Sequence, residues 1–199
     1  LEEADFQMSE LSCHAKGAYF LFPNVRTIID IGGQDAKALK IGDNGMLENF
    51  VMNDKCAAGT GRFLDVIAKV LEVDVSKLEE LDALSTKDVS ISSTCTVFAE
   101  SEVISQLASG SKIEDIVKGI HKSIAARVGS LAKRVGLNDD IIFTGGVALN
   151  KGMVRALEEN TGHKIYTSPL CQLNGALGAA LFGYQKCKLE KLKEKKANA

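Results

Sequence analysis

The spacing of apolar positions changes several times along the chain, and each change predicts a different kind of element. Apolar residues at positions 63, 64, 67, 70 and 71 follow the i, i+3, i+4, i+7 pattern of an amphipathic helix. A longer run with the same period extends from Ile113 to Val135 and stops at Gly136, a residue typical of helix ends. Further helices are expected over residues 3–16, 95–110 and 150–159, and from residue 174 onward.

Short apolar runs rich in β-branched residues predict the strands. Residues 26–31 form one such run and end in Gly32-Gly33, and residues 36–41 form a second. The segment 42–45 (Gly-Asp-Asn-Gly) is typical of a hairpin turn and leads into residues 46–52, so a three-strand meander is expected. The remaining strand candidates are residues 89–92, 140–144 and 164–168. Strands mixed with helices in this way indicate an α/β protein.

The composition narrows the class of protein. With 199 residues, of which 45% are hydrophobic and 25% charged, the chain is long enough for a sizeable core and has the balance of globular proteins. A formal net charge of −2 gives no general attraction to nucleic acid or anionic membranes. No apolar run approaches the roughly 18 residues of a membrane span, and the acidic start does not resemble a signal peptide. We therefore expect a cytoplasmic protein that binds neither nucleic acid nor membrane. The first residue, Leu1 instead of Met, suggests a fragment.

Two segments place a double glycine directly after a buried strand. In the first, Asp30 precedes Gly32-Gly33 and Gln34. Glycines let backbone N–H groups approach a phosphate, a carboxylate can hold Mg²⁺ through water, and a glutamine can orient an attacking water. In the second, Gly145-Gly146 precedes a helix whose bare N-terminus offers N–H donors and leaves room for a ring or sugar. Each pattern also fits a plain tight turn. No G-x-x-x-x-G-K-[ST] sequence occurs, so any nucleotide site here is not a P-loop.

Cys56 and Cys95 each lie among small or capping residues, at the threshold of an expected helix. A helix N-terminus favours an anionic thiolate, and two thiolates are half of a four-cysteine iron–sulfur cage. A second copy of the chain across a two-fold axis would supply the other half. The alternative is that both are buried free thiols, the role assigned to Cys13, Cys171 and Cys187.

Together these features resemble a known family, the ATP-dependent activators (component A) of 2-hydroxyacyl-CoA dehydratases, especially those of the 2-hydroxyglutaryl-CoA type. The same group includes the ATPase subunits of benzoyl-CoA reductase. The group has the actin, sugar-kinase and heat-shock ATPase superfold, which is ribonuclease H-like. The matching stretches are residues 27–38, 53–71, 90–107, 141–153 and 168–181.

The resemblance implies an iron–sulfur ATPase that transfers one low-potential electron to a dehydratase, driven by ATP. The electron donor would be a protein such as ferredoxin or flavodoxin. The resemblance implies a homodimer with one [4Fe–4S] cluster between the subunits, ligated by Cys56 and Cys95 of each. It also implies ATP or ADP with Mg²⁺. It assigns catalysis to Asp30 and Gln34, phosphate contacts to residues 30 and 32–34, and nucleoside contacts to Gly145, Gly146 and Gln172.

One part of the superfold pattern is missing. Its members begin with a first phosphate loop, Asp-x-Gly-x-Thr/Ser, and nothing before Asp30 fits this pattern. We therefore expect residues 26–172 to form the second ATPase lobe, which carries the cluster cysteines. Residues 1–25 and 173–199 would be helices of a first lobe that is mostly absent, which would leave an incomplete ATPase.

Three alternatives stay open from the sequence. The first is an ATPase subunit of a benzoyl-CoA-type reductase, with the same chemistry and a different partner. The second is a kinase of the same superfold without a cluster, in which both cysteines are simply buried. The third is a non-catalytic fragment that keeps the dimer interface and has lost its nucleotide chemistry.

Overall fold

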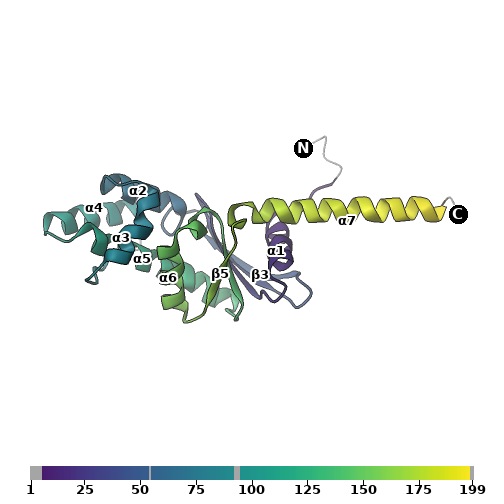
Figure 1. Ribbon diagram of the computed structural model, residues 1–199, viewed down its shortest axis with the longest axis horizontal. Helices are drawn as coiled ribbons and strands as arrows, with labels where there is room; N and C mark the ends of the chain where they lie inside the picture. Colours follow the sequence, from purple (N-terminus) through teal and green to yellow (C-terminus); the bar gives the residue numbers. More distant parts are fainter. Residues whose placement is uncertain (1–5, 54, 92–94, 198–199) are drawn as a thin grey trace.

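A mixed five-stranded sheet forms the centre of the computed structural model, which describes residues 6–53, 55–91 and 95–197 (Figure 1). Strands β1 (Thr27–Ile31), β2 (Ala36–Ile41) and β3 (Leu47–Asn53) form an antiparallel meander. Strands β4 (Ile141–Thr144) and β5 (Ile165–Thr167) continue the sheet on the other side of β1, parallel to it. The order is therefore β3-β2-β1-β4-β5, and the predicted meander and both later strands are confirmed.

Helices cover both faces of this sheet. Helix α1 (Glu10–Leu21) packs on one face, where it contacts a cluster that includes Ile28. Helices α5 (Ile113–Val135) and α6 (Lys151–Thr161) cover the opposite face, where the larger cluster includes Ile29. Successive side chains of a strand point to opposite faces, so β1 contributes to both clusters and is completely buried.

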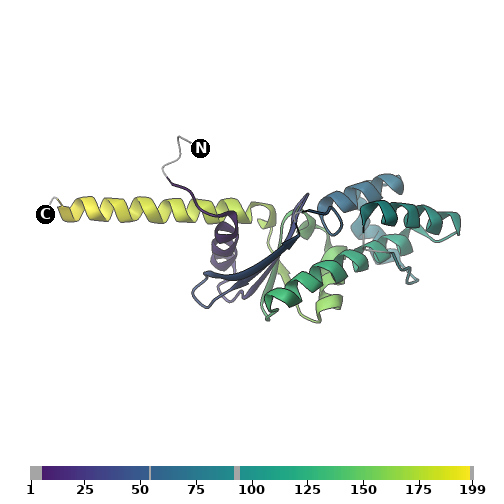
Figure 2. The same cartoon turned by 180° about the vertical axis from the view of Figure 1, so that it is seen from behind.

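Helix α5 is longer than the sheet is wide, and its first half extends past the sheet (Figure 2). Helices α2 (Gly61–Val70), α3 (Leu78–Leu84) and α4 (Thr96–Ala108) gather around that half. At the other end of the molecule, α7 (Asn174–Ala197) crosses α1 and extends away from the sheet. The two helices approach so closely that a Cβ on Gly178 would lie 1.8 Å from the carbonyl oxygen of Cys13. Short 3-10 turns occur at Val75–Lys77, Gly146–Leu149 and Cys171–Leu173.

The predicted helices over 63–71, 95–110, 113–135, 150–159 and from 174 are confirmed within a few residues, but the first helix is displaced. It was expected over 3–16 and instead begins at Glu10, because Ser9 accepts a hydrogen bond from the Ser12 amide and caps the helix there. Residues 1–5 lie outside the described part. The strand expected over 89–92 is wrong for residues 89–91, which have no strand pairing, and residue 92 is not described. Helix α3 was not predicted. Among the described residues, no helix is long and apolar enough to cross a membrane.

Candidate nucleotide site

A cleft of about 380 Å³ brings together the two double-glycine turns that follow β1 and β4. These turns are far apart in sequence, but the parallel pairing of β1 with β4 places the ends of both strands at one edge of the sheet. The opposite wall of the cleft comes from α2, α3 and the turn before α3. The lining residues are Gly32, Gly33, Gly61, Leu64, Asp65, Val75, Ser76, Glu79, Gly146, Val147, Leu149 and Asn150.

The first glycine turn is tied to the start of α2. The amides of Gly61 and Arg62 donate to the carbonyl oxygens of Gly32 and Gly33, each over 2.8 Å. These two amides of α2 are therefore occupied by the protein. A phosphate at this end of the cleft would have to use the free edge of the turn, where Gly33 and Gln34 are exposed.

The second glycine turn depends on the absence of a side chain. Gly145 has φ +88°, and a Cβ there would lie 2.2 Å from the carbonyl oxygen of Ile31. The Gly145 amide donates to the Cys171 carbonyl over 3.0 Å, which places the neighbouring Gln172 at the rim. The Nε2 atom of Gln172 would lie 3.3 Å from a Cβ on Gly146. The structure therefore places side by side Gly145, Gly146 and Gln172, the residues to which the resemblance assigns nucleoside contacts.

The expectation of a bare helix N-terminus after this turn is wrong for two amides of α6, which are bound within the protein. The 3-10 turn Gly146–Leu149 lies between Gly145 and α6, and two of the first three amides of α6 have partners. The Lys151 amide donates to Glu79 Oε2 over 3.1 Å, and the Met153 amide donates to Asn150 Oδ1 over 3.1 Å. These amides are therefore not available to a nucleotide.

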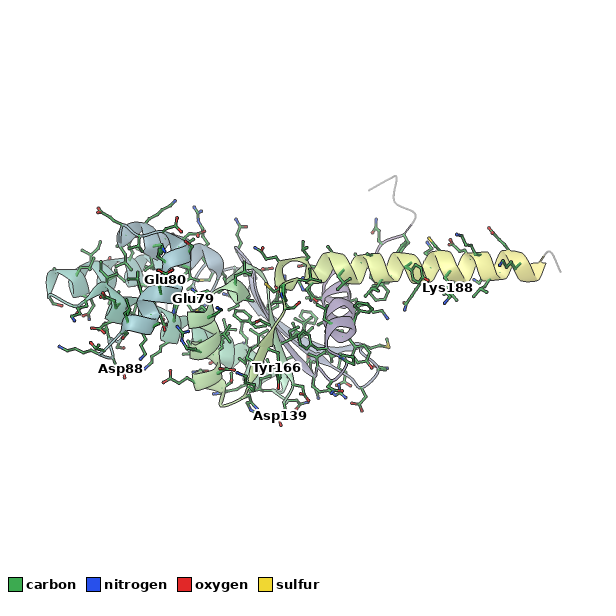
Figure 3. All side chains as sticks on the ribbon, viewed as in Figure 1. Glu79, Glu80, Asp88, Asp139, Tyr166 and Lys188 are labelled. Atoms are coloured by element: carbon green, nitrogen blue, oxygen red, sulfur yellow. The ribbon has the colours of Figure 1, made fainter. Side chains whose placement is uncertain are left out.

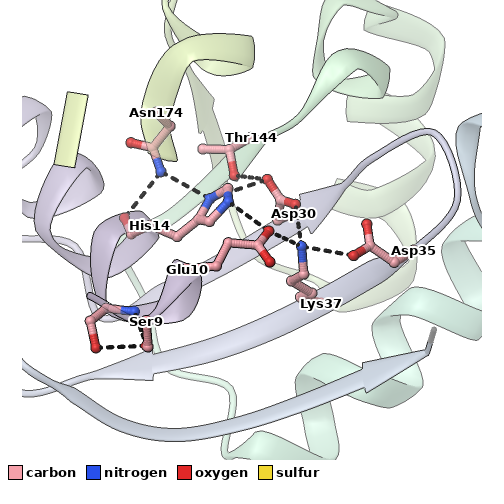
Figure 4. A network of polar contacts seen from close by, with 9 residues as sticks. Ser9, Glu10, His14, Asp30, Asp35, Lys37, Thr144 and Asn174 are labelled. Atoms are coloured by element: carbon pink, nitrogen blue, oxygen red, sulfur yellow. Dashed lines mark hydrogen bonds and ion pairs between the residues drawn. The ribbon is translucent and has the colours of Figure 1, made fainter. Parts of the chain in front are cut away.

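Asp30 lies beside the cleft without lining it. Its neighbours Ile29 and Ile31 point toward α5, so the Asp30 carboxylate points to the face covered by α1 and is only 3% exposed. Thr144 Oγ1 donates to it over 2.6 Å, and His14 Nδ1 lies 3.6 Å away (Figure 4). Asp30 is thus part of a buried polar network that sequence reasoning did not predict.

Lys37 on β2 is the centre of this network. Its Nζ lies 2.7 Å from Glu10 Oε1, 2.8 Å from Asp35 Oδ2 and 3.8 Å from Asp30 Oδ2 (Figure 4). Burial alone would lower the pKa of Lys37, but its bonds to Asp35 and Glu10 outweigh burial and raise that pKa. The buried Asn174 extends the network to α7, because its Nδ2 donates to the His14 carbonyl over 3.0 Å. The network therefore joins α1 and α7 to the first glycine turn.

A Lys37→Met variant is expected to lower the free energy of unfolding by about 3–5 kcal/mol at neutral pH, because three carboxylates lose their shared cation. Urea unfolding measures this. The folded-state pKa of Lys37 is raised, so its contribution is complete at neutral pH and is lost only as pH rises through that raised pKa. Lys40→Met is the control, because the Lys40–Glu48 pair is far more accessible to solvent, with Lys40 half-buried and Glu48 exposed, and should contribute about 1 kcal/mol or less. Equal losses in the two variants would contradict the role given to Lys37.

The two cysteines singled out by the sequence occupy different local environments. Cys95 is the N-cap residue of α4, as expected, and is half-buried. Cys56 is also half-buried but lies in the loop before α2, whose N-cap is Thr60. A turn closed by the Thr60 amide and the Ala57 carbonyl separates Cys56 from the helix, so its expected place at a helix threshold is wrong. Helices α2 and α4 pack against each other, so the segments that carry Cys56 and Cys95 lead into neighbouring helices.

Other polar residues near the cleft were also missed. His121 was given no role, yet it is completely buried and bonded to both Asp82 and Asn150. Of these residues, only Asn150 could have been singled out from the sequence. It stands at the start of a predicted helix, where asparagine is a common N-cap residue. Asp82 and Asn150, the partners of His121, and Glu10, a partner of Lys37, lie on other elements, which sequence spacing does not indicate.

The sheet order, the helices on both faces and the cleft at the ends of β1 and β4 define the class of this protein. It has the fold of the actin, sugar-kinase and heat-shock ATPase superfold. A ROK family glucokinase from Streptomyces griseus has the same fold, with a TM-score of 0.50, 15% identity, and coverage of 87% of this chain and 66% of that one. The model of the BadF/BadG/BcrA/BcrD ATPase family matches residues 2–183. The chain belongs to that family, and the predicted fold and family are confirmed.

Two similar proteins are activators of 2-hydroxyacyl-CoA dehydratases. The (R)-2-hydroxyglutaryl-CoA dehydratase activating ATPase of Acidaminococcus fermentans is 66% identical over 183 residues, covering 92% of this chain and 70% of its own length. The activator of the 2-hydroxyisocaproyl-CoA dehydratase from Clostridium difficile, solved with bound ADPNP, is 59% identical. Its TM-score is 0.92, with coverage of 96% of this chain and 71% of that one. A benzoyl-CoA reductase subunit of Thauera aromatica is 35% identical over 179 residues, covering 87% of this chain and 64% of that protein.

Proposed function

We propose that this chain acts in an ATP-driven activator of a 2-hydroxyacyl-CoA dehydratase, of the 2-hydroxyglutaryl-CoA type. In this proposal it passes one electron from a [4Fe–4S] cluster shared by two copies of the chain. The observation that carries the proposal is the 66% identity to an activating ATPase over 92% of the chain. The alternative of a benzoyl-CoA-type reductase subunit has weaker support, at 35% identity. The kinase alternative is supported by the fold alone.

The nucleotide part of the proposal uses both glycine turns. We propose that Gly32, Gly33 and the exposed edge of their turn contact the phosphates, while Gly145, Gly146 and Gln172 contact the nucleoside. The apolar side chains of Leu64 and Val147 in the cleft suit a flat base. The buried Asp30 carboxylate faces α1 and not the cleft, so in this proposal it holds Mg²⁺ through a bound water, and the ion would neutralise phosphate charge. Gln34 would orient the attacking water.

Gln34 and Gln172, two exposed glutamines next to the first and second glycine turns, give a matched pair of variants. Gln34→Ala is expected to lower the rate of ATP hydrolysis about 100-fold with little change in nucleotide affinity, because it removes only the orientation of the water. Gln172→Ala is expected to weaken nucleotide binding with little change in the maximal rate. Steady-state hydrolysis with varied ATP, measured on the chain with its first lobe restored, separates the two effects. A normal maximal rate in Gln34→Ala would contradict its assignment.

The cluster part of the proposal concerns Cys56 and Cys95. Thiolates are the ligands that iron–sulfur clusters require, and Cys95 at the N-cap of α4 lies where the helix dipole favours an anion. In the part of the chain that the structure describes, no three Cys, His, Asp or Glu side chains form a metal-binding group. In this proposal Cys56 and Cys95 supply two of the four thiolates, and a second copy of the chain across a two-fold axis supplies the other two.

Helix α2 provides a direct connection between the two parts. Its first amides bind the carbonyls of Gly32 and Gly33, it follows the Cys56 loop, and it packs against α4, which Cys95 caps. We propose that nucleotide binding moves α2 and α4 and so changes the environment of the cluster. A coupling free energy of about 1–3 kcal/mol is typical, which corresponds to roughly 40–130 mV for one electron. Identical cluster potentials with ADP and with a slowly hydrolysed ATP analogue, with and without the dehydratase, would contradict this mechanism.

We also infer that residues 26–172 form the second ATPase lobe. The observation that supports this is that α1 and α7, which lie outside this range, pack against each other, although α1 also covers one face of the sheet. The range itself contains the whole sheet and both glycine turns. Helices α1 and α7 would then belong to the first lobe, as residues 1–25 and 173–199.

The proposed function is tested on the anaerobically purified chain. Electron paramagnetic resonance after reduction with dithionite should give the signal of a reduced [4Fe–4S] cluster. An ATP analogue should bind in an equilibrium assay, and the chain should activate a 2-hydroxyacyl-CoA dehydratase only in the presence of ATP. Iron-free protein that binds the analogue would support the kinase alternative. Iron-free protein without nucleotide binding would support a non-catalytic fragment.

A further inference from the structure

We propose that His121 is a positioning residue for the nucleotide cleft, through its hydrogen bond to Asn150. This inference rests on the proposed nucleotide site. His121 lies in the middle of α5 and does not line the cleft, whereas Asn150 lines the cleft at the end of the second glycine turn. His121 would therefore act on the nucleotide only by fixing the residue that does.

Both ring nitrogens of His121 have hydrogen-bond partners. The side chain is completely buried, and its Nδ1 lies 2.6 Å from Asp82 Oδ2 on α3. Its Nε2 lies 3.1 Å from Asn150 Nδ2. The single imidazole thus connects α3, α5 and the residue that caps α6.

The hydrogen bonds determine which ring nitrogen carries the proton. Asn150 Oδ1 accepts from the Met153 amide, so the amide nitrogen of Asn150 must face His121. His121 Nε2 therefore accepts a hydrogen bond, and Nδ1 carries the proton and donates it to Asp82. Burial would raise the pKa of Asp82, but hydrogen bonds from His121 and from Arg155, at 3.0 Å, lower it overall and keep the carboxylate charged. The hydrogen-bond pattern around the ring therefore defines the tautomer with the proton on Nδ1.

Helix α3 holds the start of α6 by a second contact. Glu79, which also lines the cleft, accepts the Lys151 amide, and Figure 3 places it where α3 lies next to α6. Two contacts therefore hold Asn150 in place. Glu79 binds the backbone amide of the next residue, Lys151, and His121 binds the Asn150 side chain. If the bond to His121 is lost, Asn150 is free to rotate away from its cap, and the cleft wall formed by residues 146–150 loses its support.

Two substitutions at the same position separate this role from a structural one. The amide of an asparagine falls near Nδ1 of a histidine, so His121→Asn keeps the bond to Asp82 and loses the bond to Asn150. The amide of a glutamine reaches the position of Nε2, so His121→Gln keeps the bond to Asn150 and loses the bond to Asp82. We expect similar losses of thermal stability in both. The affinity for an ATP analogue should fall about tenfold in His121→Asn and change little in His121→Gln.

Nuclear magnetic resonance gives a readout that does not need nucleotide. The imidazole nitrogens of His121 should report a proton on Nδ1, and the Met153 amide should exchange faster in His121→Asn than in His121→Gln. A proton on Nε2, or equal affinities in the two variants, would overturn the role of His121. If the unaltered chain does not bind the analogue, the proposed nucleotide site itself is contradicted, whereas binding with no difference between the variants contradicts the role of His121 alone.

Discussion

A Cys95→Ser variant is expected to contain no intact cluster. In a two-fold symmetric cage, one substitution in the chain removes two of the four thiolate ligands, so the iron content should fall from about four per dimer to near zero. Cys56→Ser should have the same effect. Loss of the cluster also removes a link between the subunits, so the dissociation constant of the dimer should rise and monomer should appear at protein concentrations where the unaltered chain is dimeric. Iron analysis, electron paramagnetic resonance and size-exclusion chromatography of anaerobic protein measure these effects.

The control for the cysteine variants is Cys187→Ser. Cys187 is exposed on α7, far along the chain from both proposed ligands, and its replacement should leave iron content and dimer unchanged. A complete cluster in either Cys56→Ser or Cys95→Ser would rule out the proposed ligand set. Loss of iron in Cys187→Ser as well would indicate that the substitutions act through general damage.

A Gly145→Ala variant is expected to lose about 3–5 kcal/mol of unfolding free energy, together with nucleotide binding. Two costs combine: a positive φ that alanine tolerates poorly, and a Cβ that would lie 2.2 Å from the Ile31 carbonyl. Relief of that contact requires β1 and the second glycine turn to separate, and this deforms the cleft. Urea unfolding and analogue binding measure the two losses.

Gly162→Ala separates the two costs at Gly145. Gly162 ends α6 with φ +73°, and a Cβ there would meet nothing within 4 Å. Its replacement should therefore cost only about 1 kcal/mol, from backbone conformation alone, and leave nucleotide binding unchanged. If Gly145→Ala is no more destabilising than Gly162→Ala, the close approach of β1 to this turn is not what requires glycine.

Elements with a strong local pattern were predictable from the sequence, and those without one were not. Helix α5 and the meander followed from apolar spacing and a hairpin turn. Helix α3 was missed because it is short and carries several acidic residues. Residues 89–91 have the apolar positions of a strand, but Val89 and Ile91 pack into the cluster around α5 without strand partners.

In the candidate site, too, only the features with a local sequence pattern could be predicted. The double-glycine turns were visible because strand, glycine and helix are adjacent in sequence. The networks around Lys37 and His121 were not, because Lys37 pairs with Glu10 on another element, 27 residues away, and His121 pairs with Asp82, 39 residues away. The partners of a buried charge depend on packing, which no local pattern encodes.

The pairing of β1 with β4 has a consequence for how the chain folds. Asp30 and Thr144, which bond at the ends of these strands, are 114 residues apart, whereas the β1–β3 meander closes only short loops. Closing so long a segment carries a large entropic cost before any contact is gained, so the meander should form early and the β1–β4 pair late. During synthesis, the two halves of the cleft can meet only after β4 has left the ribosome. Nucleotide binding would therefore stabilise the last step of folding, and pulse-labelling hydrogen exchange should show β4 protected after β2.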